Sequence, residues 1–205
     1  MNTDIIRDII YLVTFVNPIA IFTYLKPVRD DLSEKDFVTV LMKASIISLI
    51  INLFFTYSGE FMFTSVFKIS FLSFRIFGGI VLFCLAIISI VQGKKALIVI
   101  RGSLDDLASE IALPFMTGVG TISMCILIGS RHSVAAASMI VISTKIITFA
   151  VILLIAFMSY HMPNKNLETA FDKFLGVFIR INGFFMGAIG VDMVLTGIMD
   201  YVRYI

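Results

Sequence analysis

The chain has 205 residues, of which 59% are hydrophobic and only 15% are charged, and its net charge is +2. A chain this apolar cannot bury its hydrophobic surface inside one soluble globule, so the composition excludes the soluble class and indicates an integral membrane protein. Nothing in the charge pattern suggests contact with nucleic acid, and we expect no such partner.

Apolar runs of about 20 residues, the length that a helix needs to cross ~30 Å of hydrocarbon, recur along the chain. There are six, at residues 5–26, 37–57, 74–92, 108–129, 134–160 and 174–198. The connections are short, so we expect a single all-α transmembrane domain over residues 1–205 with the lipid bilayer around it. The first run lacks a basic flank and a small-residue cleavage site, so we expect it to stay in the mature protein.

Lysine and arginine are more frequent in the odd-numbered connections than at the termini and in the even-numbered connections. Because positive residues favour the cytoplasmic side, this distribution predicts a multi-pass protein with both termini outside. The two cysteines, Cys84 and Cys125, fall inside apolar runs, where a thiol usually acts as a small packing residue. We therefore expect no disulfide.

The first run carries Asn17 and Pro18 near its middle, in the segment FVNPIAIF. Proline has no amide hydrogen and crowds the preceding turn, so the carbonyl of Thr14 loses its helical partner and a break or kink is expected. In hydrocarbon such a break is tolerated only against protein or a water-filled cavity. Asn17 adds a side chain with both a donor and an acceptor.

The fourth run has a proline and glycine segment, LPFMTGVGTI, at the matching place, which predicts a second break. Freed carbonyls at the first break could accept from an ammonium, while glycine amides at the second could donate to a carboxylate. We interpret the pair as a midplane site for a small zwitterion. The alternative is two ordinary proline kinks that pack against neighbouring helices. The candidate substrate-binding residues are Thr14, Asn17, Pro18, Pro114, Thr117, Gly118, Gly120 and Thr121.

Three correspondences indicate an internal repeat. Pro18 matches Pro114, Lys43 matches Lys145, and FRIFGG from residue 74 matches IRINGF from residue 179, with offsets of 96, 102 and 105 residues. Each half, about 1–93 and 105–205, would hold three spans. An odd number of spans makes the two halves cross the membrane in opposite senses, so we expect an inverted repeat with a substrate site near the midplane.

The sixth run presents several glycines on one helical face, and the third run shows a weaker copy of this face. Small residues at such spacing let two membrane helices approach closely. We assign these glycines to helix packing rather than to substrate contact, although they would also permit a homo-oligomer. They are Gly78, Gly79, Gly183, Gly187 and Gly190.

Ionisable residues within membrane spans are costly and are functional candidates by default. Arg75 and Arg180 lie close to the starts of their runs, so they could reach the interface or pair with Glu60. Glu110 opens the fourth run, where a carboxylate suits a helix N-terminus. For each of these residues a coupling role and a structural role remain open.

Lys145 and Asp192 lie deeper in their runs. The long stem of Lys145 could still reach an interface, whereas Asp192 points away from the glycine face of its helix and could carry a proton. Both therefore join the list of coupling candidates.

The two histidines lie at the ends of runs without the spacing of a metal site, and no nucleophile or nucleotide motif is present. We therefore expect neither a metal nor another cofactor, and we expect that the protein is not an enzyme.

Four segments together resemble the MarC family of six-span membrane proteins. They are FVNPIAIFTYLKPV, SGEFMFTSVFKISFLSFRIFGGIVLFCLAI, EIALPFMTGVGTISMCIL and RINGFFMGAIGVDMVLTGI, and the similarity covers nearly the whole chain. The resemblance implies a prokaryotic inner-membrane protein of the lysine-exporter-like superfamily, in which some relatives transport small neutral amino acids such as glycine and alanine. Ala20 and Val119 replace a glycine and a proline of the family pattern, which implies less sharply bent helices or a smaller cavity.

From these observations we expect a secondary transporter of small neutral amino acids or similar small metabolites that works by alternating access. A different class, a non-transporting membrane scaffold that binds lipid or a partner through its glycine faces, is the alternative. A wet cavity around Asn17 and Thr117 would favour transport, and their burial in helix contacts would favour the scaffold. An ion channel is disfavoured because the sequence has no ring of like charges or repeated filter segment.

Overall fold

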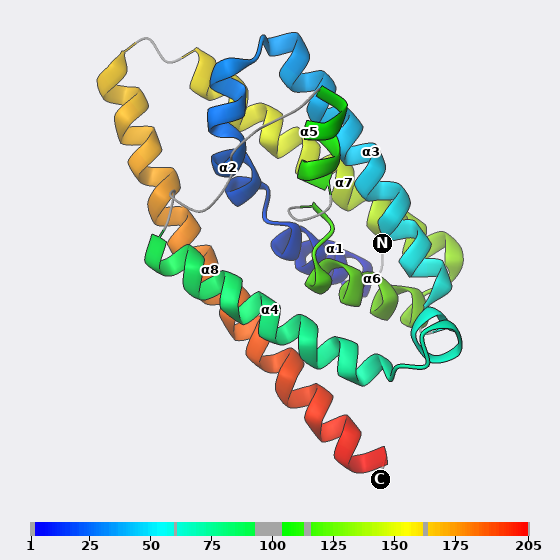
Figure 1. Ribbon diagram of the computed structural model, residues 1–205. Helices are drawn as coiled ribbons and strands as arrows, with labels where there is room; N and C mark the ends of the chain where they lie inside the picture. Colours follow the sequence, from blue (N-terminus) through cyan, green and yellow to red (C-terminus); the bar gives the residue numbers. More distant parts are fainter. Residues whose placement is uncertain (1–2, 60, 93–103, 113–115, 162–163, 205) are drawn as a thin grey trace.

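A computed structural model describes residues 3–59, 61–92, 104–112, 116–161 and 164–204 (Figure 1). All secondary structure in this part of the chain is helical, which confirms the all-α class for these residues. The elements are α1 (Thr3–Val16), α2 (Pro18–Asp31), α3 (Glu34–Ser58), a π-helical turn (Met62–Val66), α4 (Phe71–Gln92), α5 (Leu104–Ile111), α6 (Val119–Arg131), α7 (Val134–Tyr160) and α8 (Lys165–Tyr204).

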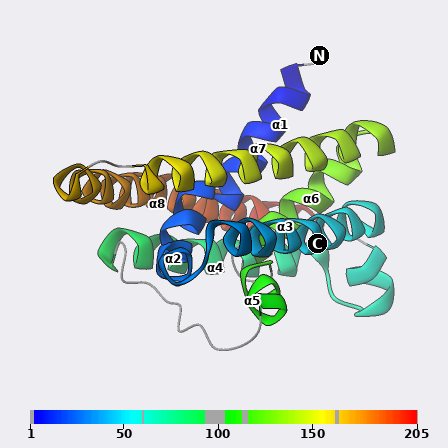
Figure 2. The same cartoon turned by 90° about the horizontal axis from the view of Figure 1, so that it is seen from above.

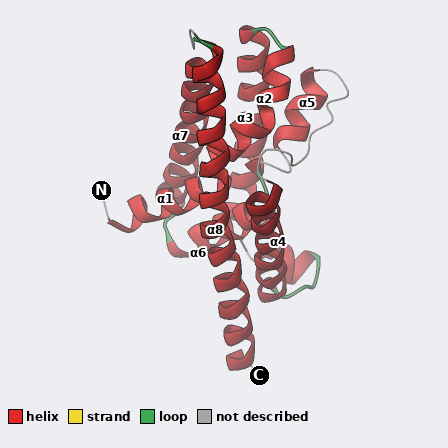
Figure 3. Ribbon diagram, turned by 90° about the vertical axis from the view of Figure 1, so that its left-hand side faces the viewer, coloured by secondary structure: helices red, strands yellow, loops and turns green. Residues whose placement is uncertain are grey.

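Five segments of the described chain are long and apolar enough to cross a membrane: Thr3–Thr23, Glu34–Ser58, Phe71–Val91, Val134–Tyr160 and Thr169–Arg203. The chain is therefore a multi-pass membrane protein. The predicted fourth run instead corresponds to two shorter helices, α5 with 8 residues and the apolar α6 with 13. The predicted sixth run lies inside α8, whose 40 residues carry it past the other helices at its C-terminal end (Figures 1 and 3).

The two long helices α3 and α7 begin in the same way. Ser33 accepts a hydrogen bond from the amide of Asp36 at 3.2 Å, and Ser133 accepts one from the amide of Ala136 at 3.4 Å. A serine at this position satisfies an amide that the first helical turn leaves without a partner. The residue before each serine is extended, so α2 turns sharply into α3 and α6 turns sharply into α7.

Helices α4 and α8 lie side by side along the glycine faces (Figure 1). A β-carbon added to Gly79 would lie 2.5 Å from the carbonyl oxygen of Gly190, and one added to Gly183 would lie 3.2 Å from that of Ala86. Residue numbers thus rise along one helix as they fall along the other, so the two helices are antiparallel. Their close approach depends on the missing side chains.

Helix α7 is shared between the two largest apolar clusters. One joins it to α2, α3 and α5, through residues such as Leu25, Leu41, Ile111 and Ile152. The other joins it to α1 and α6, through Leu12, Ile128 and Ile140. Seen from above, the N-terminal end of α1 reaches out past α7 (Figure 2). Large apolar side chains on the outer faces, such as Phe184 and Phe185 on α8, are exposed where lipid would cover them.

Candidate functional site

The first helix is interrupted at Asn17, as Pro18 predicts. α1 ends at Val16 and α2 begins at Pro18, with Asn17 between them at φ 52° and ψ 70°. This left-handed conformation is one that asparagine adopts more readily than most residues. The Oδ1 atom of Asn17 accepts from the amide of Ala20 at 3.2 Å, and Nδ2 lies 3.6 Å from Sδ of Met186 on α8. Asn17 therefore caps the new N-terminus and connects it to α8.

A second interruption separates α5 from α6. Gly118 precedes α6 in an extended conformation and provides no side-chain cap. The hydroxyl of Thr117 donates to Oγ of Ser48 at 2.8 Å, while Gly120 faces the side chain of Leu82 and Thr121 is also buried. Pro114 lies outside the described residues.

Both interruptions adjoin one apolar cluster, because Val16 and Met116 belong to the same group of buried residues. Thr14 is half-buried, and its hydroxyl donates to the carbonyl of Ile10 in its own helix at 2.8 Å. Asn17 and Thr117 are 8% and 5% exposed. Both side chains are thus packed against neighbouring helices in the described part of the structure, whereas an open transport site would expose them to water.

Lys145 brings a charge to the second break. Its side chain on α7 is buried, and its Nζ donates to the carbonyl of Met116 at 3.1 Å and to Oγ of Ser48. The Ser48 hydroxyl in turn donates to the same carbonyl at 3.1 Å. A charged group in a membrane bundle requires such acceptors, and carbonyls at a helix break are available to supply them. Lys145, Ser48, Thr117 and Met116 therefore form one connected polar group, which we name the α7 lysine cluster.

Helix α3 contributes polar residues that were not among the predicted site residues. Ser48, Asn52 and Thr56 are all buried, and their spacing of four residues places them on one face of α3. Neither amide atom of Asn52 has a hydrogen-bond partner among the described residues, and the same holds for the hydroxyl of Thr144 on α7. The signal was present in the sequence as polar residues at i, i+4 and i+8 of an apolar run.

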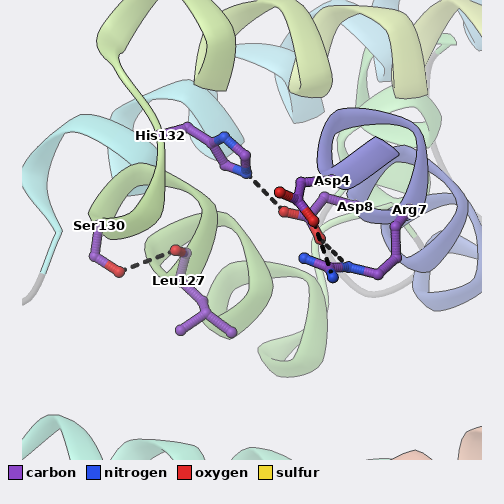
Figure 4. A network of polar contacts seen from close by, with 6 residues as sticks. All are labelled: Asp4, Arg7, Asp8, Leu127, Ser130 and His132. Carbon is purple, nitrogen blue, oxygen red and sulfur yellow. Dashed lines mark hydrogen bonds and ion pairs between the residues drawn. The ribbon is translucent and has the colours of Figure 1, made fainter. Parts of the chain in front are cut away.

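A second polar group ties α1 to the turn between α6 and α7 (Figure 4). Asp8 is 1% exposed, and its Oδ2 lies 2.7 Å from Nε2 of His132. Its other oxygen lies 3.4 Å from Nε of Arg7, which also pairs with Asp4 at 3.1 Å. No sequence pattern indicates this group, because Asp8 and His132 are 124 residues apart.

The other candidate charged residues lie in different places. Arg75 on α4 pairs with Asp200 on α8 at 3.1 Å, and Arg180 is exposed on α8. Glu60 and the side chain of Glu110 lie outside the described part of the structure. Among the described residues, no group of three histidine, cysteine or acidic side chains is placed to hold a metal ion.

A cavity of about 440 Å³ opens between α1, α4, α6 and α8. Its walls are largely apolar and include Phe15 and Leu127, whereas Arg75, Arg131 and Asp192 supply charges. The structure therefore brings together Arg75 and Asp192, which the sequence analysis singled out separately. Lys145 and Arg180 are not among the residues that line it.

The sequence of the chain is similar to those of known membrane proteins. The sequence model described as MarC family integral membrane protein matches residues 2–202. A UPF0056 membrane protein of Pyrococcus horikoshii is 24% identical over 198 residues, which cover 96% of this chain and 94% of the relative. A UPF0056 membrane protein of Aquifex aeolicus is 24% identical over 212 residues, which cover 97% and 94%. No solved structure matches the chain significantly.

Proposed function

Because the chain belongs to the MarC family of integral membrane proteins, we propose that it is a secondary transporter. It carries small neutral amino acids or similar small metabolites across the inner membrane of a prokaryotic cell by alternating access, with both termini outside. The observation that carries the proposal is the pair of interrupted helices, α1–α2 and α5–α6, inside a membrane bundle. Discontinuous helices of this kind form the midplane sites of many secondary transporters, because their free ends offer amides and carbonyls to a substrate.

Local geometry supports an inverted repeat of two three-span halves. α2 and α6 have 14 and 13 residues, both end in an extended residue, and each is followed by a capping serine and a long helix of 25 or 27 residues. The last helices of the halves, α4 and α8, are antiparallel through the contact of Gly79 and Gly190. An inverted repeat requires this antiparallel relation, since each element of one half crosses the membrane in the opposite sense to its counterpart.

The chemistry of the breaks suits a zwitterion. The N-terminus of α6 at Gly118 has no side-chain cap, so its amides can receive a carboxylate. Asn17 can turn its amide from Ala20 and Met186 toward a substrate as the bundle opens. The burial of Asn17 and Thr117 is the packing that we expect of an occluded state of the cycle, and the cavity beside Phe15 is the space from which a substrate would approach.

One observation favours the alternative of a non-transporting scaffold, namely the burial of Asn17 and Thr117 in contacts. A second observation weighs against it. The scaffold would use the glycine faces for a partner, yet Gly79 and Gly190 already contact each other within the chain. Transport therefore remains the proposed function. The scaffold alternative predicts that the protein in liposomes transports neither amino acid.

The test is uptake and counterflow of radiolabelled glycine and alanine by the purified protein in liposomes, with imposed pH and sodium gradients. Asn17→Gly is the informative variant, because glycine tolerates the left-handed conformation while the amide is lost. Asn164→Gly is its matched control. Asn164 is exposed before α8, where its Oδ1 accepts from the amide of Asn166 at 3.1 Å, so the control also removes an asparagine from a helix start.

We expect saturable transport by the native protein and by Asn164→Gly, and at least a tenfold loss in Asn17→Gly. Unchanged transport by Asn17→Gly would show that the side chain at the first break does not take part in the site. If the folded native protein moves neither amino acid nor other small neutral metabolites, the scaffold becomes the better account.

A further inference from the structure

The second helix break contains a set of oxygen atoms of the kind that binds a small cation. In the buried interior, the hydroxyl of Ser48 lies within hydrogen-bonding distance of both the carbonyl of Met116 and the hydroxyl of Thr117. Carbonyl and hydroxyl oxygens at broken membrane helices commonly coordinate a coupling ion such as sodium. Here the ammonium group of Lys145 lies where such an ion would bind, because its Nζ donates to the Met116 carbonyl and to Oγ of Ser48.

Burying a charged side chain costs free energy unless hydrogen-bond acceptors surround it, and at this break the acceptors are the Met116 carbonyl and the Ser48 hydroxyl. Lys145 is 5% exposed and approaches the oxygens from α7, a different helix from the one that is broken. Thr144 and Thr148 on α7 and Asn52, one turn after Ser48 on α3, are also buried polar residues, and their side chains have no hydrogen-bond partners among the described residues. The two helices that meet at the second break therefore bury polar side chains as well as apolar ones, which suits a cation better than a wholly apolar interior would.

We propose that the ammonium group of Lys145 is a built-in cation that occupies the place of a diffusible monovalent cation at the α5–α6 break. The role of Lys145 in a transport cycle rests on the proposed function, but the binding of its ammonium group at the break can be tested without transport. The tethered charge holds the Met116 carbonyl in both loaded and empty protein, so the transporter needs no sodium at this position. Lys145 is accordingly a positioning residue, which acts on the substrate through the backbone at Thr117 and Gly118.

The experiment removes the tethered charge and supplies a free one. Lys145→Ala deletes three carbons and the nitrogen beyond Cβ, which propylammonium can replace as a small diffusible ion. Lys145→Met keeps most of the side-chain length without the charge, so it leaves no space for that ion. Lys43→Ala is the matched control, because Lys43 is the counterpart of Lys145 in the sequence repeat but is exposed on α3.

The first measurement is the thermal unfolding midpoint in detergent, with propylammonium, sodium or the bulky tetramethylammonium as chloride salts at equal ionic strength. We expect Lys145→Ala and Lys145→Met to unfold at lower temperature than the native protein, and only Lys145→Ala to recover with propylammonium or sodium. Tetramethylammonium should have no such effect, and Lys43→Ala should behave as the native protein does with every salt.

Recovery of equal size in Lys145→Ala, Lys145→Met and Lys43→Ala would show a general salt effect and overturn the proposal. So would full stability of Lys145→Ala without any added cation, or the absence of recovery with every cation.

The second measurement is transport in liposomes in which potassium replaces sodium on both sides. We expect the native rate to stay within about twofold, and Lys145→Ala to lose at least tenfold and to recover partly with propylammonium. A native protein that transports only with sodium would overturn the proposal while leaving the transport function intact. A native protein that transports nothing would contradict the proposed transport function. The role of Lys145 would then still be decided by the cation-specific recovery of stability.

Discussion

A β-carbon built on Gly79 of α4 would lie 2.5 Å from the carbonyl oxygen of Gly190 on α8, and one built on Gly190 would lie 2.7 Å from the carbonyl oxygen of Gly79. The two backbones therefore meet directly, and neither position has room for a side chain. This contact holds together α4 and α8, which correspond to the third and sixth predicted spans.

The glycine contact predicts a sharp difference between two alanine substitutions. Gly79→Ala must push backbone apart and should destabilise the protein by about 1–3 kcal/mol, the usual cost of overpacking. Gly187→Ala meets only the β-carbon of Ala86 at 3.3 Å, which requires a shift of a few tenths of an ångström rather than a displacement of backbone, so it should destabilise the protein less than Gly79→Ala does. Unfolding in a titration with sodium dodecyl sulfate would measure both free energies. Equal stability of the two variants would contradict the direct backbone contact between Gly79 and Gly190.

The pair of Asp8 and His132 predicts a strong stability effect far from the breaks. Asp8→Asn replaces the carboxylate partner of His132 by a weaker amide and should cost about 1.5–3 kcal/mol, the usual contribution of a hydrogen bond to a charged group. Asp4→Asn is the control, since the Asp4 side chain is 61% exposed and its ion pair with Arg7 should contribute about 0–1 kcal/mol. Thermal unfolding midpoints in one detergent would compare them. A larger loss in Asp4→Asn than in Asp8→Asn would reverse the expected order.

The backbone at Asn17 predicts that glycine is tolerated better than leucine. At φ 52° leucine carries a steric strain of about 1–2 kcal/mol that glycine lacks, while both substitutions remove the side-chain cap. Asn17→Leu should therefore be the less stable variant in the same denaturant titration. If leucine proves equally stable, the left-handed conformation at the break is wrong.

The ion pair between Arg75 and Asp200 predicts recovery on exchange of the two charges. Arg75→Asp brings two carboxylates together and should lower the stability, whereas Arg75→Asp with Asp200→Arg should restore most of it. The expected gain is about 0.2–1 kcal/mol because the Asp200 side chain is 46% exposed and solvent screens the pair. Unfolding midpoints at low and high salt would test this, since the gain should shrink as salt screens the charges. No recovery in the double variant would show that the pair does not join α4 to α8.

The features that depend on local chemistry could be predicted from the sequence. Apolar runs determine helices because a bilayer leaves backbone groups no partner outside the helix, so α3, α4 and α7 lie close to their predicted limits. Pro18 has no amide hydrogen to donate, and the helix is interrupted there for that reason. The small-residue spacing of Gly183, Gly187 and Gly190 likewise marked a face before any partner was known.

Only the tertiary structure decided which groups meet. Nothing local connects Asp8 to His132 or Lys145 to the carbonyl of Met116, because both pairs arise from the packing of helices that are distant in sequence. Lys145 looked like a residue that could reach the interface, yet the break between α5 and α6 supplied it with acceptors inside the bundle. Helix formation follows from the solvent and the chain's own periodicity, whereas the partners of a buried charge follow from the whole bundle.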